Sequence, residues 1–204
     1  MLAQYYVDLT TRKGVEIAPG VLASNLMQRV HLFIKEATQA GCHVAVAFPD
    51  MVARFGIGER QRWFAEQRET LEALIDRLAR DPRFDDYWIA RQIKPVPEAC
   101  DRQVAYVRYR LSHAVSQARA ARHPRAATLE AINRKMREKR LRYLESTPAG
   151  IGYLDLRSAS TQQQFRLFVQ RVDVSPQIMS NASTPDSYGL SRPTQIVALP
   201  EFEP

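Results

Sequence analysis

Two hydrophobic periods alternate along the first 97 residues, and their order limits the folds that this part of the chain can adopt. Residues 5–10 place apolar side chains at every second position, which is the period of a strand with one buried face. After Pro19 and Gly20 the apolar period changes to three or four residues, which indicates an amphipathic helix that Gly41 ends. Its expected buried stripe comprises Leu22, Leu26, Val30, Phe33 and Ala37.

The same alternation continues to about residue 97. Strands are predicted over residues 43–48, 59–66 and 87–96. A second helix, which ends near Asp81, is marked by Leu71, Leu74, Ile75 and Leu78. The resulting order is β-α-β-β-α-β, which is that of the ferredoxin-like fold. We therefore predict an α+β protein in which residues 1–97 form a ferredoxin-like domain.

Residues 98–204 are predicted to form a second domain, which begins after the turn-forming sequence KPVPE. Antiparallel strands are expected at about 103–110, 153–158 and 164–172. Residues 112–145 have helical propensity throughout, but Pro124 interrupts it. A short helix is therefore expected before Pro124, and a longer one from about 126 to 145.

The positive charge of the chain is concentrated in one segment. The whole chain carries a net charge of +7, and residues 119–142 contain nine Lys or Arg against two Glu, which is also +7. A solvated helix face normally interleaves acidic residues that pair with the basic ones. This segment mostly does not, which favours a polyanionic partner such as nucleic acid over a merely soluble basic helix.

Several classes of function lack their sequence signals. No run approaches the roughly 20 apolar residues of a membrane span, and the N-terminus has no secretory signal. Cys42 and Cys100 lie far apart and are expected to be buried, reduced thiols of a cytoplasmic protein. There is no HExxH or DxD motif, no Cys/His ligand spacing, no glycine-rich phosphate loop and no GxSxG motif. We therefore expect neither a metal nor a cofactor.

Metal-free RNA cleavage gives a small set of residues a functional interpretation. It requires a base that takes the proton of the ribose 2′-OH, and His31, at the edge of the first helix's apolar stripe, is such a group. A lone histidine at such an edge is more often structural or solvated. Ser158, Ser160 and Tyr188 could hold the 2′-OH in line with the phosphate, although loop serines are mostly turn formers. Phe165 is either a core residue or a stacking surface for a base.

Two stretches resemble a known family. LRSASTQQQFRLFVQR at 156–171 and DSYGLS at 186–191 closely resemble the C-terminal signature of the CRISPR repeat-processing endoribonuclease of type I-F systems. The N-terminal half agrees in YYVDL, RVHLFI, VAVAFPD and IGER. The likeness covers most of the chain, and the order and spacing of these pieces make chance a poor explanation.

The resemblance implies a fold and an activity. The family has a ferredoxin-like N-terminal domain and a C-terminal domain whose arginine-rich helix enters the groove of the repeat's RNA hairpin. Cleavage at the 3′ base of the hairpin needs no metal and leaves a 5′-OH and a 2′,3′-cyclic phosphate. The implied partners are the repeat hairpin, the mature guide RNA that the enzyme retains, and the other subunits of the type I-F interference complex.

The resemblance also implies roles for individual residues. His31 matches the catalytic histidine, and Tyr188 matches the tyrosine that orients it. Ser158 matches the serine that holds the 2′-OH, and Ser160 matches a second serine near the scissile nucleotide. Phe165 matches the aromatic residue that stacks on the terminal base pair.

The base-reading residues depart from the family pattern. Where the family has an Arg and a Gln two residues apart, this chain has Tyr106 and Arg108. Arg108 or Arg110 remains a candidate for a bidentate contact with a guanine edge. The other predicted RNA-binding residues are Arg119, Arg122, Arg134, Arg137 and Arg140.

Two other functions compete with cleavage. A structural subunit could bind the hairpin without cutting it, and only the combination of His31, Ser158 and Tyr188 separates that class from the enzyme. A generic RNA binder of the RRM type would carry paired aromatic residues in an RNP-like run, and the sequence has no such run.

Overall fold

A computed structural model of the chain describes residues 3–51, 56–109, 138, 150–158, 161–175 and 183–203. The chain divides into two compact units, one formed by Met1–Tyr109 with Gly150–Pro204 and the other by Arg110–Ala149. The described helices and strands belong to the first unit, which is a mixed α/β structure with two antiparallel sheets. Within the described residues, no helix combines the length and the apolar character that crossing a membrane requires.

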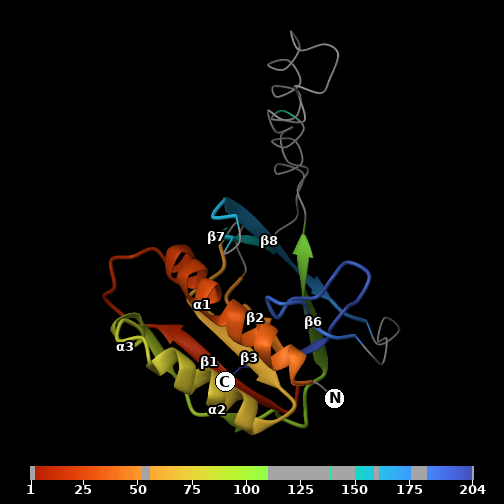
Figure 1. Cartoon of the computed structure of the whole chain (residues 1–204). Coiled ribbons are helices and arrows are strands. Elements are labelled where there is room, and N and C mark those ends of the chain that lie inside the picture. The colour runs from red at the N-terminus through yellow and green to blue at the C-terminus, as the bar shows by residue number, and fades with distance from the viewer. Residues whose placement is uncertain are drawn as a thin grey trace. The chain divides into compact units, whose positions relative to one another are not determined.

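The first sheet is built from the N-terminal half. Its elements are β1 (Tyr5–Thr11), α1 (Pro19–Gln39), β2 (Val44–Ala47), β3 (Arg60–Ala65), α2 (Arg68–Ala79), α3 (Phe84–Tyr87), β4 (Trp88–Ala90) and β5 (Lys94–Pro95). The strand order is β2-β3-β1-β4 with every neighbouring pair antiparallel, and β5 also pairs with β1. The predicted order of strands and helices is thus observed, with the fourth strand divided into β4 and β5 and the short α3 before it. Figure 1 shows α1 and α2 side by side on one face of this sheet.

Helix α1 is set by its end signals and its apolar stripe. Pro19 occupies the first turn, where the missing N–H is not needed, and Gly41 adopts a φ of 80° just after the helix. Leu22, Leu26 and Val30 are buried as predicted. The predicted stripe was wrong at its C-terminal end, because Ile34 is buried there while Phe33 and Ala37 lie half-buried on the flank.

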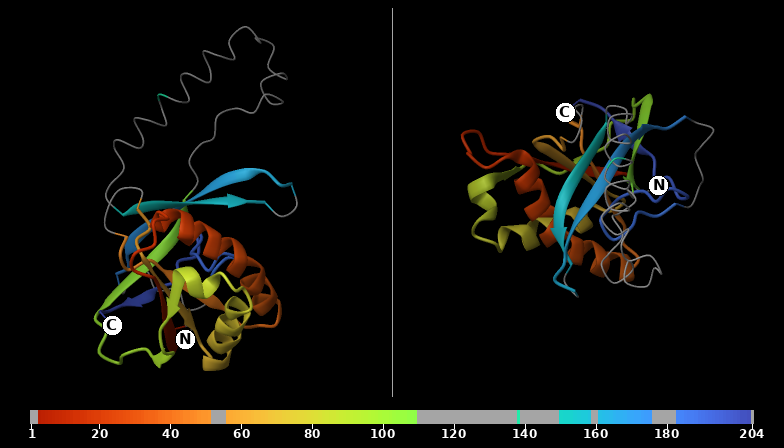
Figure 2. Two further views of the ribbon diagram at one scale, coloured as in Figure 1. Left: turned by 90° about the vertical axis from the view of Figure 1, so that its left-hand side faces the viewer. Right: turned by 90° about the horizontal axis from the view of Figure 1, so that it is seen from above.

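The second sheet is built from the C-terminal half. It contains β6 (Arg102–Tyr109), β7 (Ile151–Arg157), β8 (Gln164–Asp173) and β9 (Leu199–Glu201) in the antiparallel order β7-β8-β6-β9. Figure 2 shows β7 and β8 as a hairpin, and β7 packs against α1. Residue 97, where the domain boundary was predicted, lies between β5 of the first sheet and β6 of the second. However, the buried side chains of both sheets form one continuous hydrophobic core, so both sheets lie in a single compact unit.

The two cysteines differ from their expected burial. Cys42 and Cys100 are free thiols, but each is half-buried rather than buried. Both lie in connecting segments, each two residues before a strand begins. The thiol of Cys100 donates a hydrogen bond to the carbonyl of Glu201 at 3.2 Å.

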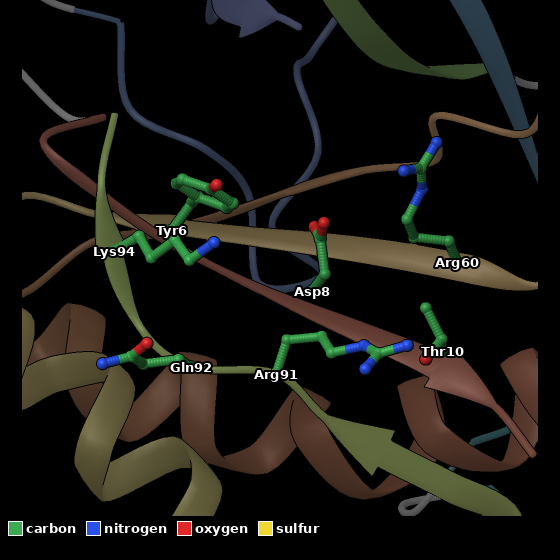
Figure 3. A pocket seen from close by; sticks show the side chains of 7 residues that line it. All are labelled: Tyr6, Asp8, Thr10, Arg60, Arg91, Gln92 and Lys94. Carbon is green, nitrogen blue, oxygen red and sulfur yellow. The ribbon is translucent and has the colours of Figure 1, made fainter. Parts of the chain in front are cut away.

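The side of β1 that carries Tyr6, Asp8 and Thr10 bears a buried ion pair and a cavity. Arg62 donates two hydrogen bonds to the Asp8 carboxylate, at 2.7 and 2.8 Å, and a third to the Phe202 carbonyl at 2.7 Å. Its guanidinium also lies over the Phe202 ring at 4.1 Å. Beside this pair is a cavity of about 480 Å³. Figure 3 shows its lining side chains, which are Tyr6, Asp8, Thr10, Arg60, Arg91, Gln92 and Lys94.

Candidate active site

His31 and Tyr188 are far apart in the sequence but in direct contact in the structure. Their rings are stacked with centroids 4.3 Å apart and planes inclined by 11°. His31 Nδ1 lies 2.8 Å from the carbonyl oxygen of Ser187. Because a carbonyl can only accept, Nδ1 must carry the proton in this bond, and in a neutral ring Nε2 is then the unprotonated nitrogen. The contact thus selects the tautomer in which Nε2 can act as a base.

The segment that supplies Ser187 and Tyr188 is a tight turn. Asp186, which is buried, accepts hydrogen bonds from the backbone N–H groups of Tyr188 and Leu190 at 2.9 and 3.1 Å. Gly189 has a φ of 75°, and its carbonyl accepts a hydrogen bond from the Val46 N–H in β2 at 2.9 Å. A Cβ at this position would lie 3.2 Å from backbone atoms of β2, so glycine allows the close approach.

Arg108, on β6, completes the contacts around Tyr188. Its guanidinium carbon lies 5.5 Å from the centroid of the Tyr188 ring, and its Nη1 lies 3.8 Å from Asp186. The backbone N–H of Arg108 donates to the Ser191 carbonyl at 2.8 Å, which ties the turn to β6. A histidine, a tyrosine and an arginine are therefore stacked in series, with a buried carboxylate at one end.

Burial determines the protonation preferences of two of these groups. It raises the pKa of the Tyr188 hydroxyl, an effect that the nearby Arg108 cation partly offsets, so the phenol remains a proton donor at neutral pH. Burial likewise raises the pKa of Asp186, although its two backbone hydrogen bonds and Arg108 favour the ionised form.

Helix α1 is held against β7 in a defined register. The Ser24 hydroxyl accepts the Asp155 N–H at 2.9 Å, and the Gln28 side-chain carbonyl accepts the Arg157 N–H at 2.8 Å. Four helical residues rise about 6 Å and two strand residues about 6.6 Å, so helix and strand advance together. The loop that follows β7 begins with Ser158.

That loop is built around Ser158. The Ser158 carbonyl accepts the Gln162 N–H, and its N–H donates to the Gln163 carbonyl, both at 2.9 Å. Its hydroxyl accepts the Thr161 N–H at 3.3 Å, which is the turn-forming role common to loop serines. Gln162 adopts a φ of 56°, as a tight hairpin connection requires. The hydroxyl of Ser158 therefore lies in a backbone-rich turn at the end of β7.

The side chain of Tyr106 lies in the core. It is only 2% exposed and packs edge-on against Phe48 with ring centroids 5.6 Å apart. Burial raises the pKa of Tyr106 to about 12. The side chain is thus part of the core and cannot meet a base edge in this structure.

Comparison with known proteins places these residues in a family. Residues 6–202 match the family model described as CRISPR-associated protein (Cas_Csy4). The chain belongs to this family. It is 28% identical over 190 residues to the "CRISPR-associated endonuclease Cas6/Csy4" of Pseudomonas aeruginosa (strain UCBPP-PA14), an alignment that covers 92% of this chain and 95% of that protein. It is also similar, with a TM-score of 0.37 and 15% identity, to Thermus thermophilus Cse3 bound to an RNA representing a pre-cleavage complex; the match covers 97% of this chain and 100% of that one.

In this Cas_Csy4 family member the structure brings some of the predicted site residues together and places others elsewhere. His31, Tyr188 and Arg108 form one stack, and Ser158 lies in the loop after β7. Phe165, at the start of β8, is half-buried against the core and pairs in register with Leu156. The residues outside the described part of the chain are Ser160, Arg110, Arg119, Arg122, Arg134, Arg137 and Arg140.

Sequence reasoning missed the residues that hold the site together. Ser24 and Gln28 precede His31 by seven and three positions on one helix flank, and this polar stripe beside the apolar one was a usable signal. Asp186 begins the sequence Asp-Ser-Tyr-Gly, and an Asp at the start of such a glycine-containing segment is typical of an Asx-type turn. The role of the Ser187 carbonyl had no signal, because every residue has a carbonyl.

Proposed function

We propose that this chain is an endoribonuclease that processes CRISPR RNA by cutting a repeat hairpin. Membership of the Cas_Csy4 family and likeness to a bacterial CRISPR-associated endonuclease along nearly the whole chain support the substrate class. The single observation that carries the activity is the bond between His31 Nδ1 and the Ser187 carbonyl. It gives the chain a histidine whose neutral tautomer leaves Nε2 able to accept a proton.

The proposed reaction is an attack within the RNA. His31 Nε2 takes the proton of the ribose 2′-OH, and the oxygen attacks the adjacent phosphorus. The bond from phosphorus to the 5′-oxygen breaks, and that oxygen leaves with the electron pair and takes up the proton that His31 removed, delivered by the imidazolium or through solvent. The products are a 2′,3′-cyclic phosphate and a 5′-OH, so no water is consumed. This scheme gives every proton a destination without a metal or a cofactor.

Tyr188, Ser158 and Phe165 are proposed to position the reactants. Tyr188 covers one face of the imidazole and so limits its rotation. The Ser158 hydroxyl holds the 2′-OH in line with the phosphate, with Ser160 nearby, and Phe165 stacks on the terminal base pair of the hairpin. Arg108 or Arg110 contacts a base edge.

The remaining features of the proposal concern fold, substrate and assembly. We assign the first sheet to the ferredoxin-like arrangement, which the antiparallel order β2-β3-β1-β4 supports. The cut falls at the 3′ base of the hairpin, and the basic segment of residues 119–142 binds the stem. The protein then stays on the guide RNA within the type I-F interference complex. The proposed location is the cytoplasm, where free thiols such as Cys42 and Cys100 are usual.

The test uses the repeat RNA of the protein's own locus in the presence of EDTA, followed by analysis of the product ends. We expect cleavage to products with a 2′,3′-cyclic phosphate and a 5′-OH. A substrate with a 2′-deoxyribose at the cleavage site should bind but remain intact, because the nucleophile is absent. Tight binding without any cleavage of the natural RNA would instead identify a structural hairpin-binding subunit. Cleavage of the deoxy substrate would exclude attack by the 2′-OH.

A further inference from the structure

Helix α1 has a second functional flank, which faces away from the active site. His31 is two residues from both Arg29 and Phe33, so it lies about 200° around the helix from each of them. The flank that carries Ser24, Gln28 and His31 contacts β7 and the 186–190 turn. The flank that carries Arg29 and Phe33 faces α2. A change on this second flank therefore leaves the catalytic contacts in place.

A groove runs between the second flank of α1, α2 and the turn after α2. It encloses about 530 Å³, which is within the range of about 300–1,000 Å³ typical of ligand pockets. We call it the α1–α2 groove. Its apolar lining residues are Val30, Phe33, Leu74, Leu78 and Pro82, and its charged lining residues are Arg29, Arg77, Arg80, Asp81 and Arg83. Phe33 and Pro82 expose apolar surface within it, because Phe33 is half-buried and Pro82 is exposed.

The charges around the groove do not balance. Asp81 is shared by Arg29 and by Arg83, whose Nε lies 3.8 Å away, while Arg77 pairs with Glu36 at 2.6 Å. Arg80 makes no ion pair with the residues that the structure describes. Four cations thus meet two carboxylates. The pKa of Arg29 is lowered mainly by burial and further by the charge of Arg83.

The chemistry of the lining favours a protein occupant over RNA. Base edges are read by amides, hydroxyls and bidentate arginines, and of these the lining offers only arginines. Three of the four arginines already contact a carboxylate of this chain. The groove is also bounded by two helices rather than by a free strand edge, so a peptide cannot add to a sheet here. An apolar trough with a basic rim matches a helix whose apolar stripe is flanked by acidic residues.

We propose that the α1–α2 groove docks a helix of a partner protein that presents apolar side chains at i, i+3, i+4 and i+7 with Asp or Glu on both sides of them. The apolar stripe covers Phe33 and Pro82, and the carboxylates pair with Arg80 and with Arg29 and Arg83, which share the single carboxylate of Asp81. This proposal does not rest on RNA cleavage, since the groove and the catalytic contacts lie on different flanks of α1.

The experiment measures fluorescence anisotropy with the full-length protein and two labelled 16-residue helical peptides. Both peptides carry leucines at the four stated positions, and they differ only in having Glu or Lys at the flanking positions. We expect the Glu peptide to bind at least tenfold more tightly than the Lys peptide. Arg80→Glu, which breaks no ion pair with the described residues, should weaken the Glu peptide at least tenfold, and so should Phe33→Ala. Arg91→Glu, at an exposed arginine of the cavity in Figure 3, is the matched control and should change nothing.

Three outcomes would overturn the proposal. The first is equal binding of the two peptides, or no binding of either. The second is that Arg80→Glu lowers both the affinity for the repeat hairpin and the dependence of that affinity on salt concentration. This result would show that the groove binds RNA. The third is a dimer of the free protein that Arg80→Glu dissociates, which would make the occupant a second copy. Hairpin cleavage and melting temperature, measured on the same variants, report separately on the proposed enzyme and on folding.

Discussion

At the scale of single residues, the candidate site depends on one hydrogen bond that determines a proton's position. The Ser187 carbonyl accepts from His31 Nδ1, and the stacked Tyr188 ring restricts the imidazole. In the proposed mechanism the site therefore holds its base in place before any RNA is bound. What the RNA adds in the proposed mechanism is the nucleophile and its alignment with the phosphate.

His31→Ala tests the base directly. Loss of general base catalysis should slow hairpin cleavage by about 10²–10⁴-fold, while the affinity for the hairpin stays nearly constant because no phosphate contact is removed. Single-turnover cleavage and equilibrium binding, measured on the same preparation, check both parts. His43→Ala, at a half-buried histidine beside β2, is the control and should retain the wild-type rate. Unchanged cleavage by His31→Ala would remove the histidine from the mechanism.

Asp186 gives a prediction about stability and pH. Its folded-state pKa is raised, mainly by burial, above the value of about 3.9 for an unfolded Asp. The stability that protonation contributes is therefore fully present below pH 3.9 and is lost as the pH rises through the folded pKa. Asp186→Asn stays neutral and keeps an acceptor for the two N–H groups, so it should gain stability relative to the wild type between pH 3.5 and 7. Urea unfolding at both pH values measures this, and a relative loss of stability at pH 7 would contradict it.

At the scale of elements, the geometry of the candidate site arises from how α1, β7 and the 186–190 turn are attached to one another. Helix α1 is bonded to β7 by Ser24 and Gln28, and the turn is bonded to β2 through the Gly189 carbonyl. His31 and Tyr188 therefore meet because two separate backbone attachments bring their elements to the same place.

Gly189→Ala should disturb this meeting point. The new Cβ would sit 3.2 Å from the Val44 oxygen and the Val46 nitrogen, in a residue with a φ of 75°. Gly14→Ala is the matched control, because Gly14 has a φ of 82° and nothing within 4 Å of the added atom. Both variants should lose the roughly 1–2 kcal/mol that a left-handed conformation costs a residue with a Cβ. Only Gly189→Ala should lose further stability and slow cleavage, as melting curves and cleavage rates would reveal. Equal effects of the two substitutions would show that the contact with β2 is unimportant.

The elements were more predictable than the contacts between them. Helix α1 was predicted closely because Pro19 and Gly41 are local end signals that need no tertiary information. Tyr106 is a contact that the sequence pattern could not predict. Strand alternation assigns Tyr106 to the same face as Arg108, but it does not reveal that Phe48 covers the tyrosine. The pairing of Asp8 with Arg62 was equally hidden, because a polar residue in a strand normally indicates a solvated face. In each case the deciding partner lies far away in the sequence.

At the scale of the whole molecule, one buried arginine connects the two ends of the chain. Arg62 on β3 bonds to Asp8 on β1 and to the carbonyl of Phe202 near the C-terminus. Both charged side chains are at most 5% exposed, so neither can be solvated if the other is removed.

Arg62→Ala is therefore expected to destabilise the fold by about 3–5 kcal/mol, because it leaves the Asp8 carboxylate buried and unpaired. Arg68→Ala removes the exposed pair with Glu72 on α2 and should cost about 0.3–0.5 kcal/mol. Denaturant unfolding of the two variants measures the difference. A cost below about 1 kcal/mol for Arg62→Ala would mean that water or a rearranged side chain replaces the arginine.

The charge distribution leads to the last prediction. Residues 119–142 carry a net charge of +7, equal to that of the whole chain, so the proposed affinity for RNA should reside there. Each phosphate that a cation neutralises releases counterions, which gives the logarithm of the binding constant a slope of about −0.7 to −0.9 per phosphate against the logarithm of salt concentration. Arg→Ala at a phosphate contact should lower the slope by about one and weaken all hairpins alike. At a base contact, for which Arg108 and Arg110 are the candidates, the substitution should cost about 1–3 kcal/mol of binding free energy and relax the sequence preference at one base pair.

Titrations at several salt concentrations, on the cognate hairpin and on one with a swapped base pair, separate the two kinds of contact. If Arg134, Arg137 and Arg140 can each be replaced without changing affinity or slope, the segment is only a solvated surface and the RNA binds elsewhere.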